Sequence, residues 1–155
     1  MYIGNQSSDS VSVINGVTNS IITTISVGDS PSFFVSVGDK IYVANIASNN
    51  VSVINSVTDA VIATVTVGSA PNYMTVHNGE IYVMNSSSNN VSVINSVTDA
   101  VIATVTVGSA PNFASFSNGN IYVSNINSDS VSVIDTVNNT VSQTIPVGDN
   151  PNFSF

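Results

Sequence analysis

Short apolar runs separated by polar turns follow one another along the whole chain. Between residues 73 and 107 the apolar runs lie at 73–76, 81–84, 91–94 and 101–107, too short for helices and with a clear alternation of Val and Thr in the last of them. Asn78-Gly79 separates the first two runs, and this dipeptide favours a two-residue hairpin because both residues tolerate a positive φ. This stretch therefore predicts four short antiparallel strands.

The same arrangement recurs every 40 residues. Tyr appears at 2, 42, 82 and 122, Val-Ser-Val-Ile begins at 11, 51, 91 and 131, and Val-Gly-x-x-Pro begins at 27, 67, 107 and 147. Residues 51–72 and 91–112 are identical. We divide the chain into repeats at approximately 2–41, 42–81, 82–121 and 122–155, which make one propeller or half-propeller domain over 1–155.

Four antiparallel strands per 40 residues, with short loops, are typical of a β-propeller blade. The composition agrees, because 56 of the 155 residues are Val, Ile or Thr and none is Leu. The second strand of each repeat is apolar on both faces, as a strand between neighbouring blades would be. Pro146 lies in a fourth strand, which suits an outer sheet edge. We predict an all-β propeller with four blades per chain.

The order of strands raises a question of ring closure. The chain begins on a second strand, Tyr2-Ile3, and ends on a first strand, residues 152–155. We expect this last inner strand to close the first blade, because its edge would otherwise present unpaired backbone groups. Closure within one chain makes a four-bladed ring, closure between two chains makes an eight-bladed homodimeric ring, and donation without closure makes a polymer. We expect the dimer.

The repeats resemble those of a known family. Tyr42-Val43-Ala44-Asn45, the segment 48–55 and the segment 61–68 are similar to the YVTN repeat of archaeal and bacterial surface proteins, a relative of WD40-type propellers. None of the four opening tetrads has Thr in third place. The resemblance covers the whole chain and implies a propeller, commonly of seven or eight blades, in a surface-layer type of protein.

Charge and composition restrict the classes of partner and the location that we expect. The net charge is −8, and Lys40 is the only Lys or Arg, so we expect no nucleic-acid partner. No apolar run is long enough to predict membrane insertion. Only 6% of residues are charged, and a surface of Ser, Thr and Asn keeps its solubility when pH or salt changes. We therefore expect an extracellular or cell-surface location.

Candidate chemistry is sparse. His77 is the only His and there is no Cys, which excludes a multi-His or Cys metal site within one chain. Asp59 and Asp99 alternate with Asn19 and Asn139 at the same repeat position, which suits a turn better than acid–base chemistry. We predict no catalytic residues, no metal and no cofactor, and therefore that the chain is not an enzyme.

Two sets of repeated residues are candidates for binding on a ring face. Amides end each second strand, where they either line the channel mouth or bond within the loop that they begin; they are Asn5, Asn45, Asn85 and Asn125. Aromatic rings follow each Pro, where they either stack on a ligand or pack between blades; they are Phe33, Tyr73, Phe113 and Phe153.

These observations favour a non-catalytic propeller scaffold or binding module, with a protein or a glycan as its ligand. One alternative is a self-assembling structural protein, since the fourth strands form uncharged edges that invite pairing with other sheets. Another is an isolated or engineered fragment of a larger propeller with no independent function.

Overall fold

Fifteen strands and two short 3₁₀ helices account for most of residues 1–152, the part that this computed structural model describes. The first sheet contains β1 Tyr2–Asn5, β2 Ser10–Asn15 and β3 Ser20–Ser26, with η1 Gln6–Ser8 between β1 and β2. The second sheet contains β4 Pro31–Val37, β5 Lys40–Asn45, β6 Asn50–Asn55 and β7 Ala60–Thr66. The third contains β8 Pro71–His77, β9 Glu80–Asn85, β10 Asn90–Asn95 and β11 Ala100–Thr106. The fourth contains β12 Pro111–Ser117, β13 Asn120–Asn125, β14 Ser130–Asp135 and β15 Thr140–Pro146, with η2 Ile126–Ser128 between β13 and β14.

Each sheet is an antiparallel meander in which strands that follow one another in sequence are neighbours. The registers repeat from sheet to sheet: Tyr42 opposes Val53 as Tyr82 opposes Val93. In each sheet, the pairing of the last two strands shifts register just after the Val-Ser-Val segment, as between Val53 and Ile54. The predicted four-stranded repeat is therefore confirmed; the first three strands extend the predicted apolar runs by one or two residues at their ends, and the fourth begins and ends one residue earlier than predicted.

Turn residues explain where the strands stop. Asn78 and Gly79 both have positive φ, +48° and +77°, as the predicted two-residue hairpin requires. At the other type of turn, Asn95 Oδ1 accepts hydrogen bonds from the amides of Val97 and Thr98, and Asp99 follows with a φ of +53°. The predicted turn role of Asp99 and its counterparts is confirmed, because Asn19, Asp59 and Asn139 also have positive φ.

Consecutive sheets pack face to face with β4, β8 and β12 innermost and β7, β11 and β15 outermost. We call each contact between consecutive sheets a seam. At the seam between the second and third sheets, Tyr42, Val51 and Val53 pack against Met74 and Ile94, and all five are buried. The strands β5, β6, β9 and β10 are consequently buried on both faces, as predicted for strands between blades.

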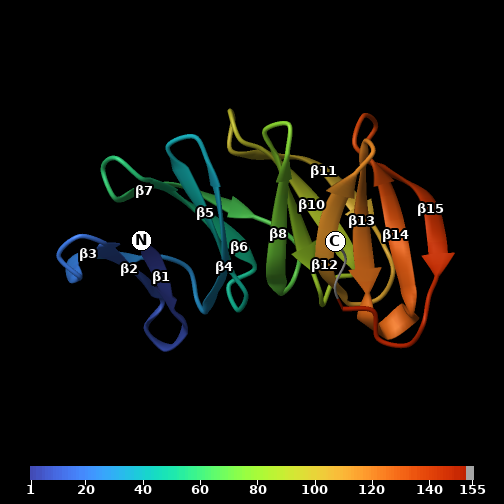
Figure 1. Cartoon of the computed structure of the whole chain (residues 1–155), viewed down its shortest axis with the longest axis horizontal. Helices are drawn as coiled ribbons and strands as arrows, with labels where there is room; N and C mark the ends of the chain where they lie inside the picture. Colours follow the sequence, from blue (N-terminus) through green and yellow to red (C-terminus); the bar gives the residue numbers. More distant parts are fainter. Residues whose placement is uncertain (153–155) are drawn as a thin grey trace.

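The four sheets form an open arc, with the first and last at opposite ends of the long axis (Figure 1). The hairpins β4–β5, β8–β9 and β12–β13 point toward one edge of this arc, the upper edge in Figure 1. In the first sheet β1 pairs only with β2 among the described residues. The strand predicted to close this blade, residues 152–155, lies outside the described residues except for Asn152.

Pro146 ends β15, which pairs only with β14 within residues 1–152, so its predicted position at a sheet edge is confirmed. No helix in this part of the chain is long and apolar enough to cross a membrane.

Burial at the seams predicts where truncation is costly. Ile94 is fully buried between the second and third sheets, whereas Ile22 on the outer strand β3 is 57% exposed. We expect Ile94→Ala to lower the free energy of unfolding by about 2–5 kcal/mol, through lost burial and the cavity that remains. Ile22→Ala is the matched control, with an expected change of less than about 0.5 kcal/mol. Urea unfolding followed by circular dichroism measures both, and equal losses contradict the assignment of the core to the seams.

Candidate functional site: the seams and the two free ends

Each seam holds a glycine loop from one sheet against a polar cluster on the next sheet. We call residues 27–30, 67–70, 107–110 and 147–150 the glycine loops, and residues 6–9, 46–49, 86–89 and 126–129 the serine loops. A Cβ atom built on Gly68 would lie 2.4 Å from Ser88 Oγ, 2.5 Å from Asn90 Oδ1 and 2.7 Å from Asn85 Nδ2. Only glycine therefore lets the loop approach this cluster so closely.

Backbone hydrogen bonds fix the glycine loop in the same way at all three seams. The amides of Asp29, Ser69 and Ser109 each donate to a serine Oγ of the next sheet at 2.9 Å, and the acceptors are Ser48, Ser88 and Ser128. In return, the next serine loop donates to the glycine loop, as from the amide of Ser87 to Ser69 O at 3.1 Å. Each seam is therefore closed by reciprocal bonds as well as by apolar contact.

The candidate amides Asn45, Asn85 and Asn125 lie inside this cluster and are fully buried. The Nδ2 group of Asn85 donates to Asn90 Oδ1 at 2.8 Å and to Ser92 Oγ at 2.9 Å, while its Oδ1 has no partner among the described residues. Asn5 makes the corresponding bonds to Ser10 and Ser12, but it is partly exposed. Three of the four predicted binding amides thus hold neighbouring strands together inside the seams.

The candidate aromatic rings lie against one another in tilted pairs along the inner strands. Phe33 and Tyr73 have ring centroids 4.4 Å apart, and Tyr73 and Phe113 repeat this distance. Burial raises the pKa of the Tyr73 phenol. Phe153 lies outside the described residues. The three described rings pack between sheets, which was one of the two predicted roles; ligand binding by these aromatic and amide residues stays a prediction.

A chain of amides runs beside these rings. Asn72 Nδ2 donates to Asn112 Oδ1 at 3.0 Å, and Asn112 Nδ2 donates to Asn152 Oδ1 at 2.7 Å. The first bond joins the inner strands β8 and β12, and the second joins β12 to Asn152, just after the last glycine loop.

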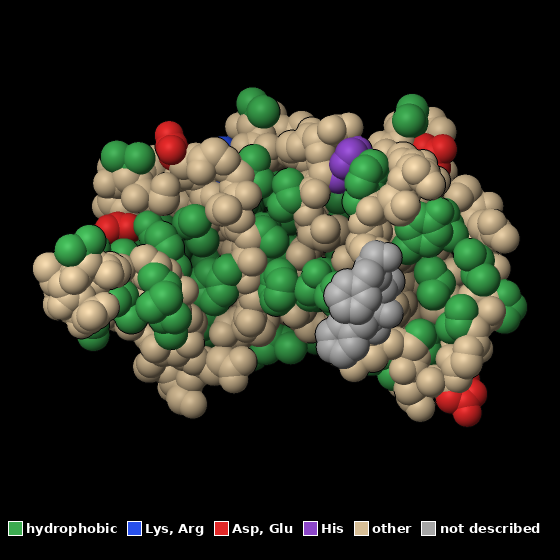
Figure 2. Space-filling model, in the orientation of Figure 1, with side chains coloured by type: hydrophobic (Ala, Val, Ile, Leu, Met, Phe, Trp, Pro, Cys, Tyr) green, Lys and Arg blue, Asp and Glu red, His purple; other side chains and the backbone are tan. Residues whose placement is uncertain are grey.

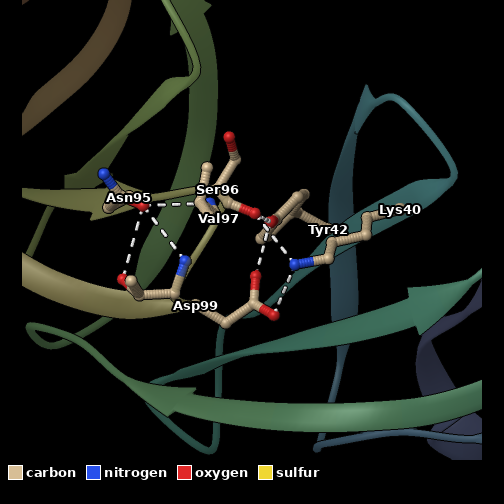
Figure 3. Close-up of polar contacts among 7 residues, drawn as sticks. Lys40, Tyr42, Asn95, Ser96, Val97 and Asp99 are labelled. Carbon is tan, nitrogen blue, oxygen red and sulfur yellow. Dashed lines mark hydrogen bonds and ion pairs between the residues drawn. The ribbon is translucent and has the colours of Figure 1, made fainter.

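A tyrosine hydroxyl crosses each seam near the hairpin edge, and Figure 3 shows the contact between the second and third sheets. Tyr42 donates to Asp99 Oδ1 at 2.6 Å, and Lys40 Nζ lies 2.7 Å from the other carboxylate oxygen of Asp99 and donates to Ser96 O. Tyr2 makes the same bond to Asp59 at 2.7 Å. At the third seam Tyr82 donates to Asn139 Oδ1 and to Glu80.

These surroundings raise the pKa values of the three tyrosine phenols. Burial, together with the hydrogen bond and the charge of Asp59, raises the pKa of Tyr2 to about 12. Burial and Asp99 raise the pKa of Tyr42, and burial with Glu80 and Asp135 raises that of Tyr82. All three phenols therefore remain neutral donors at physiological pH.

The two end sheets carry the halves of a seam that have no counterpart within residues 1–152. Gly148 has open space where its Cβ would be, in contrast to Gly28, Gly68 and Gly108. In the part of the chain that the structure describes, the cluster of Asn5, Ser8, Ser10 and Ser12 has no glycine loop against it. The hydroxyl of Tyr122 makes no hydrogen bond to any described residue, while Tyr2, Tyr42 and Tyr82 all do.

Side chains that could act in catalysis or bind a metal are scarce in the described part of the chain. His77 stacks on Phe116 with centroids 3.6 Å apart, at the β8–β9 hairpin. No three His, Asp or Glu side chains within residues 1–152 gather as metal ligands would. Figure 2 shows a face covered mainly by uncharged polar and apolar side chains.

The fold is that of a β-propeller, and solved structures share it. The chain is similar to hydrazine synthase of Kuenenia stuttgartiensis, with a TM-score of 0.83 and 22% identity over 93% of this chain and 45% of that one. It is also similar to the dihydro-heme d1 dehydrogenase NirN in complex with DHE, with a TM-score of 0.84 and 12% identity over 98% of this chain and 36% of that one. The chain thus spans less than half of either protein. Its sequence matches no family model and no curated protein.

The prediction that the chain is not an enzyme is contradicted by this comparison, because both matched propellers belong to proteins named as enzymes. A propeller poor in ionisable side chains was not a sufficient reason to exclude catalysis, since one fold serves many functions. At these identities the likeness extends to the fold alone.

The close approach at Gly68 predicts a large effect for one methyl group. Gly68→Ala has to displace side chains that are already bonded to one another, so we expect a loss of about 1–3 kcal/mol in the free energy of unfolding. Gly16→Ala is the matched control, because a Cβ at Gly16 meets nothing within 4 Å. Thermal or urea unfolding of both variants tests this, and equal stabilities contradict the geometry of the seam.

The raised tyrosine pKa values predict alkaline sensitivity. The unfolded chain releases phenol protons near pH 10.0, while folded Tyr2 keeps its proton to about pH 12. The corresponding stability is full below about pH 10 and is lost as the pH rises through about 12. Urea midpoints measured across this range should fall with pH, and fall less steeply in Tyr2→Phe. A midpoint that stays constant over the range contradicts the prediction.

Proposed function

We propose that the chain is one half of an eight-bladed β-propeller, that two copies complete the ring, and that the ring serves as a binding scaffold. One observation carries this proposal: three internal seams reuse one set of contacts, and the two end sheets carry the two unmatched halves of that same set. A second copy offers the missing half to each end.

The apolar faces of the end sheets support this pairing. Ile3 on the first sheet is 41% exposed, whereas Val43 and Val83 at the same repeat position are fully buried. On the last sheet Tyr122 and Val131 are partly exposed, although their counterparts in the second and third sheets are fully buried. Apolar side chains reach the surface at both ends of the face in Figure 2. Burial of these faces would stabilise the pair of chains.

The polar groups at the ends are complementary in the same sense. In the proposed ring, Gly148 of one copy lies against Ser8, Ser10 and Asn5 of the other, as Gly68 lies against its own cluster. By the same repeat, the Tyr122 hydroxyl reaches Asn19 of the second copy, since Asp59, Asp99 and Asn139 hold that position at the internal seams.

The shape of the arc favours closure by two copies. Because its first and last sheets lie at opposite ends of the long axis, a twofold axis brings both pairs of ends together at once (Figure 1). The second candidate is an open head-to-tail polymer, which the same unmatched ends would build if the curvature does not close.

The repeat motifs support the part of the proposal that concerns the location of the protein and its ligand. Their resemblance to the YVTN repeat supports a surface-protein role outside the cell, with a protein or a glycan as the ligand of the ring. The low charge and the surface of Ser, Thr and Asn suit such a place.

The open space at Gly148 supplies the test. Gly148→Ala leaves the single chain unstrained, but its methyl group would enter the polar cluster of the second copy, so we expect it to shift the protein from dimer to monomer. Light scattering after size exclusion should give twice the 16.0 kDa mass of one chain for the wild type and 16.0 kDa for the variant.

Val97→Ala, on an exposed turn of the third sheet and so away from both end sheets, should remain dimeric. A wild type that is monomeric at all concentrations contradicts the proposal, and a broad heavy species indicates the polymer instead.

A further inference from the structure

The glycine and serine loops alternate along one edge of the arc, opposite the β4–β5, β8–β9 and β12–β13 hairpins. The amide of Ala70 in a glycine loop donates to Asn49 Oδ1 of the serine loop of its own repeat, and its neighbour Ser69 donates to Ser88 of the next serine loop. Each glycine loop therefore lies between two serine loops, and the last residue of each serine loop alternates in a single row with the third residue of each glycine loop.

Acidic residues occupy only the two ends of this row. In order along the arc, its members are Asp9, Asp29, Asn49, Ser69, Asn89, Ser109, Asp129 and Asp149. The bonds that set their positions are the same whether the residue is Asp or Asn: Ser30 donates to Asp9 Oδ1 at 3.0 Å, as Ala110 donates to Asn89 Oδ1 at 2.9 Å. The turn does not require a carboxylate, so the charge at the ends is not explained by local structure.

Closing the ring would bring the acidic ends together. Asp149 of one copy would lie beside Ser8 and Asp9 of the second copy, as Ser69 lies beside Ser88 and Asn89 at an internal seam. Asp129 of the first copy and Asp29 of the second copy flank this pair. Each of the two seams between copies would gather four carboxylates, whereas the central seam within a chain has neutral residues at all four positions.

Within residues 1–152, no cationic side chain pairs with these carboxylates. The neighbouring loop side chains are the hydroxyl and amide groups of Ser8, Ser30 and Asn150. The one Lys lies at the opposite edge, where it pairs with Asp99, and the N-terminal ammonium bonds to Ile14 O at that edge as well. His77 stacks on Phe116 in a hairpin of that edge.

We propose that ring closure is an acid- and salt-sensitive switch, opposed at neutral pH by repulsion among Asp129 and Asp149 of one copy and Asp9 and Asp29 of the other. This inference rests on the proposed dimer. Salt screens such exposed charges, and protonation removes them, so closure strengthens as ionic strength rises or as pH falls.

Sedimentation equilibrium tests the switch through the dimer dissociation constant. We expect this constant to fall about tenfold between about 10 mM and about 1 M NaCl at pH 7, as the Debye length shrinks from about 30 to about 3 Å. A similar fall is expected at low salt between pH 7 and about pH 4, where carboxylates take up protons.

The repeats provide the matched variants. Asp9→Asn with Asp149→Ser places at the ends the residues that internal seams already carry, and it should bind more tightly at low salt and lose most of the salt and pH dependence. Asp39→Asn with Asp135→Asn removes the same charge from the opposite edge and should keep the dependence.

A wild-type dissociation constant that is independent of salt and pH overturns the switch and leaves the dimer standing. Equal loss of dependence in both double variants also overturns it, since net charge alone then explains the effect. A chain that is monomeric under every condition overturns the dimer and the switch together.

Discussion

The structure depends on contact between consecutive sheets. A single sheet of this chain presents apolar residues on two faces, and it is stabilised only where another sheet covers each face. The second sheet has such neighbours on both sides, which is why Tyr42, Val43, Val51 and Ile54 are all fully buried. The first and last sheets have one neighbour each within the described residues, so the same residue types remain partly exposed there. Within residues 1–152, the four repeats thus leave one apolar face of each end sheet without a covering sheet.

Much of the fold could be predicted from the sequence because each local signal agreed with the 40-residue period. The Asn78-Gly79 hairpin, the Val-Ser-Val-Ile strands and the edge position of Pro146 all rest on local chemistry, and all are confirmed. The role of Asp99 as a turn residue was also predictable. Its acceptance of hydrogen bonds from Tyr42 and Lys40 was not, because these residues lie more than fifty positions apart and meet only after the sheets pack.

The candidate site was only partly predictable for the same reason. Asn45, Asn85 and Asn125 were recognised as a repeated set, but a sequence does not show that a glycine of the preceding repeat covers them. The signal that could have revealed the seam was the parallel recurrence of Val-Gly-x-x-Pro with the Ser and Asn residues of the next repeat. The prediction about enzyme activity was wrong because it counted ionisable side chains, whereas the fold occurs in proteins that carry out reactions.

The identical segments 51–72 and 91–112 have a consequence for how such a chain can change its length. When every unit offers its successor the same surface that it received from its predecessor, a unit can be inserted or deleted by unequal recombination without disturbing the rest. The terminal surfaces stay compatible whatever the number of units between them. In the ring proposed above, selection on the number of blades would then act on the curvature that each unit imposes.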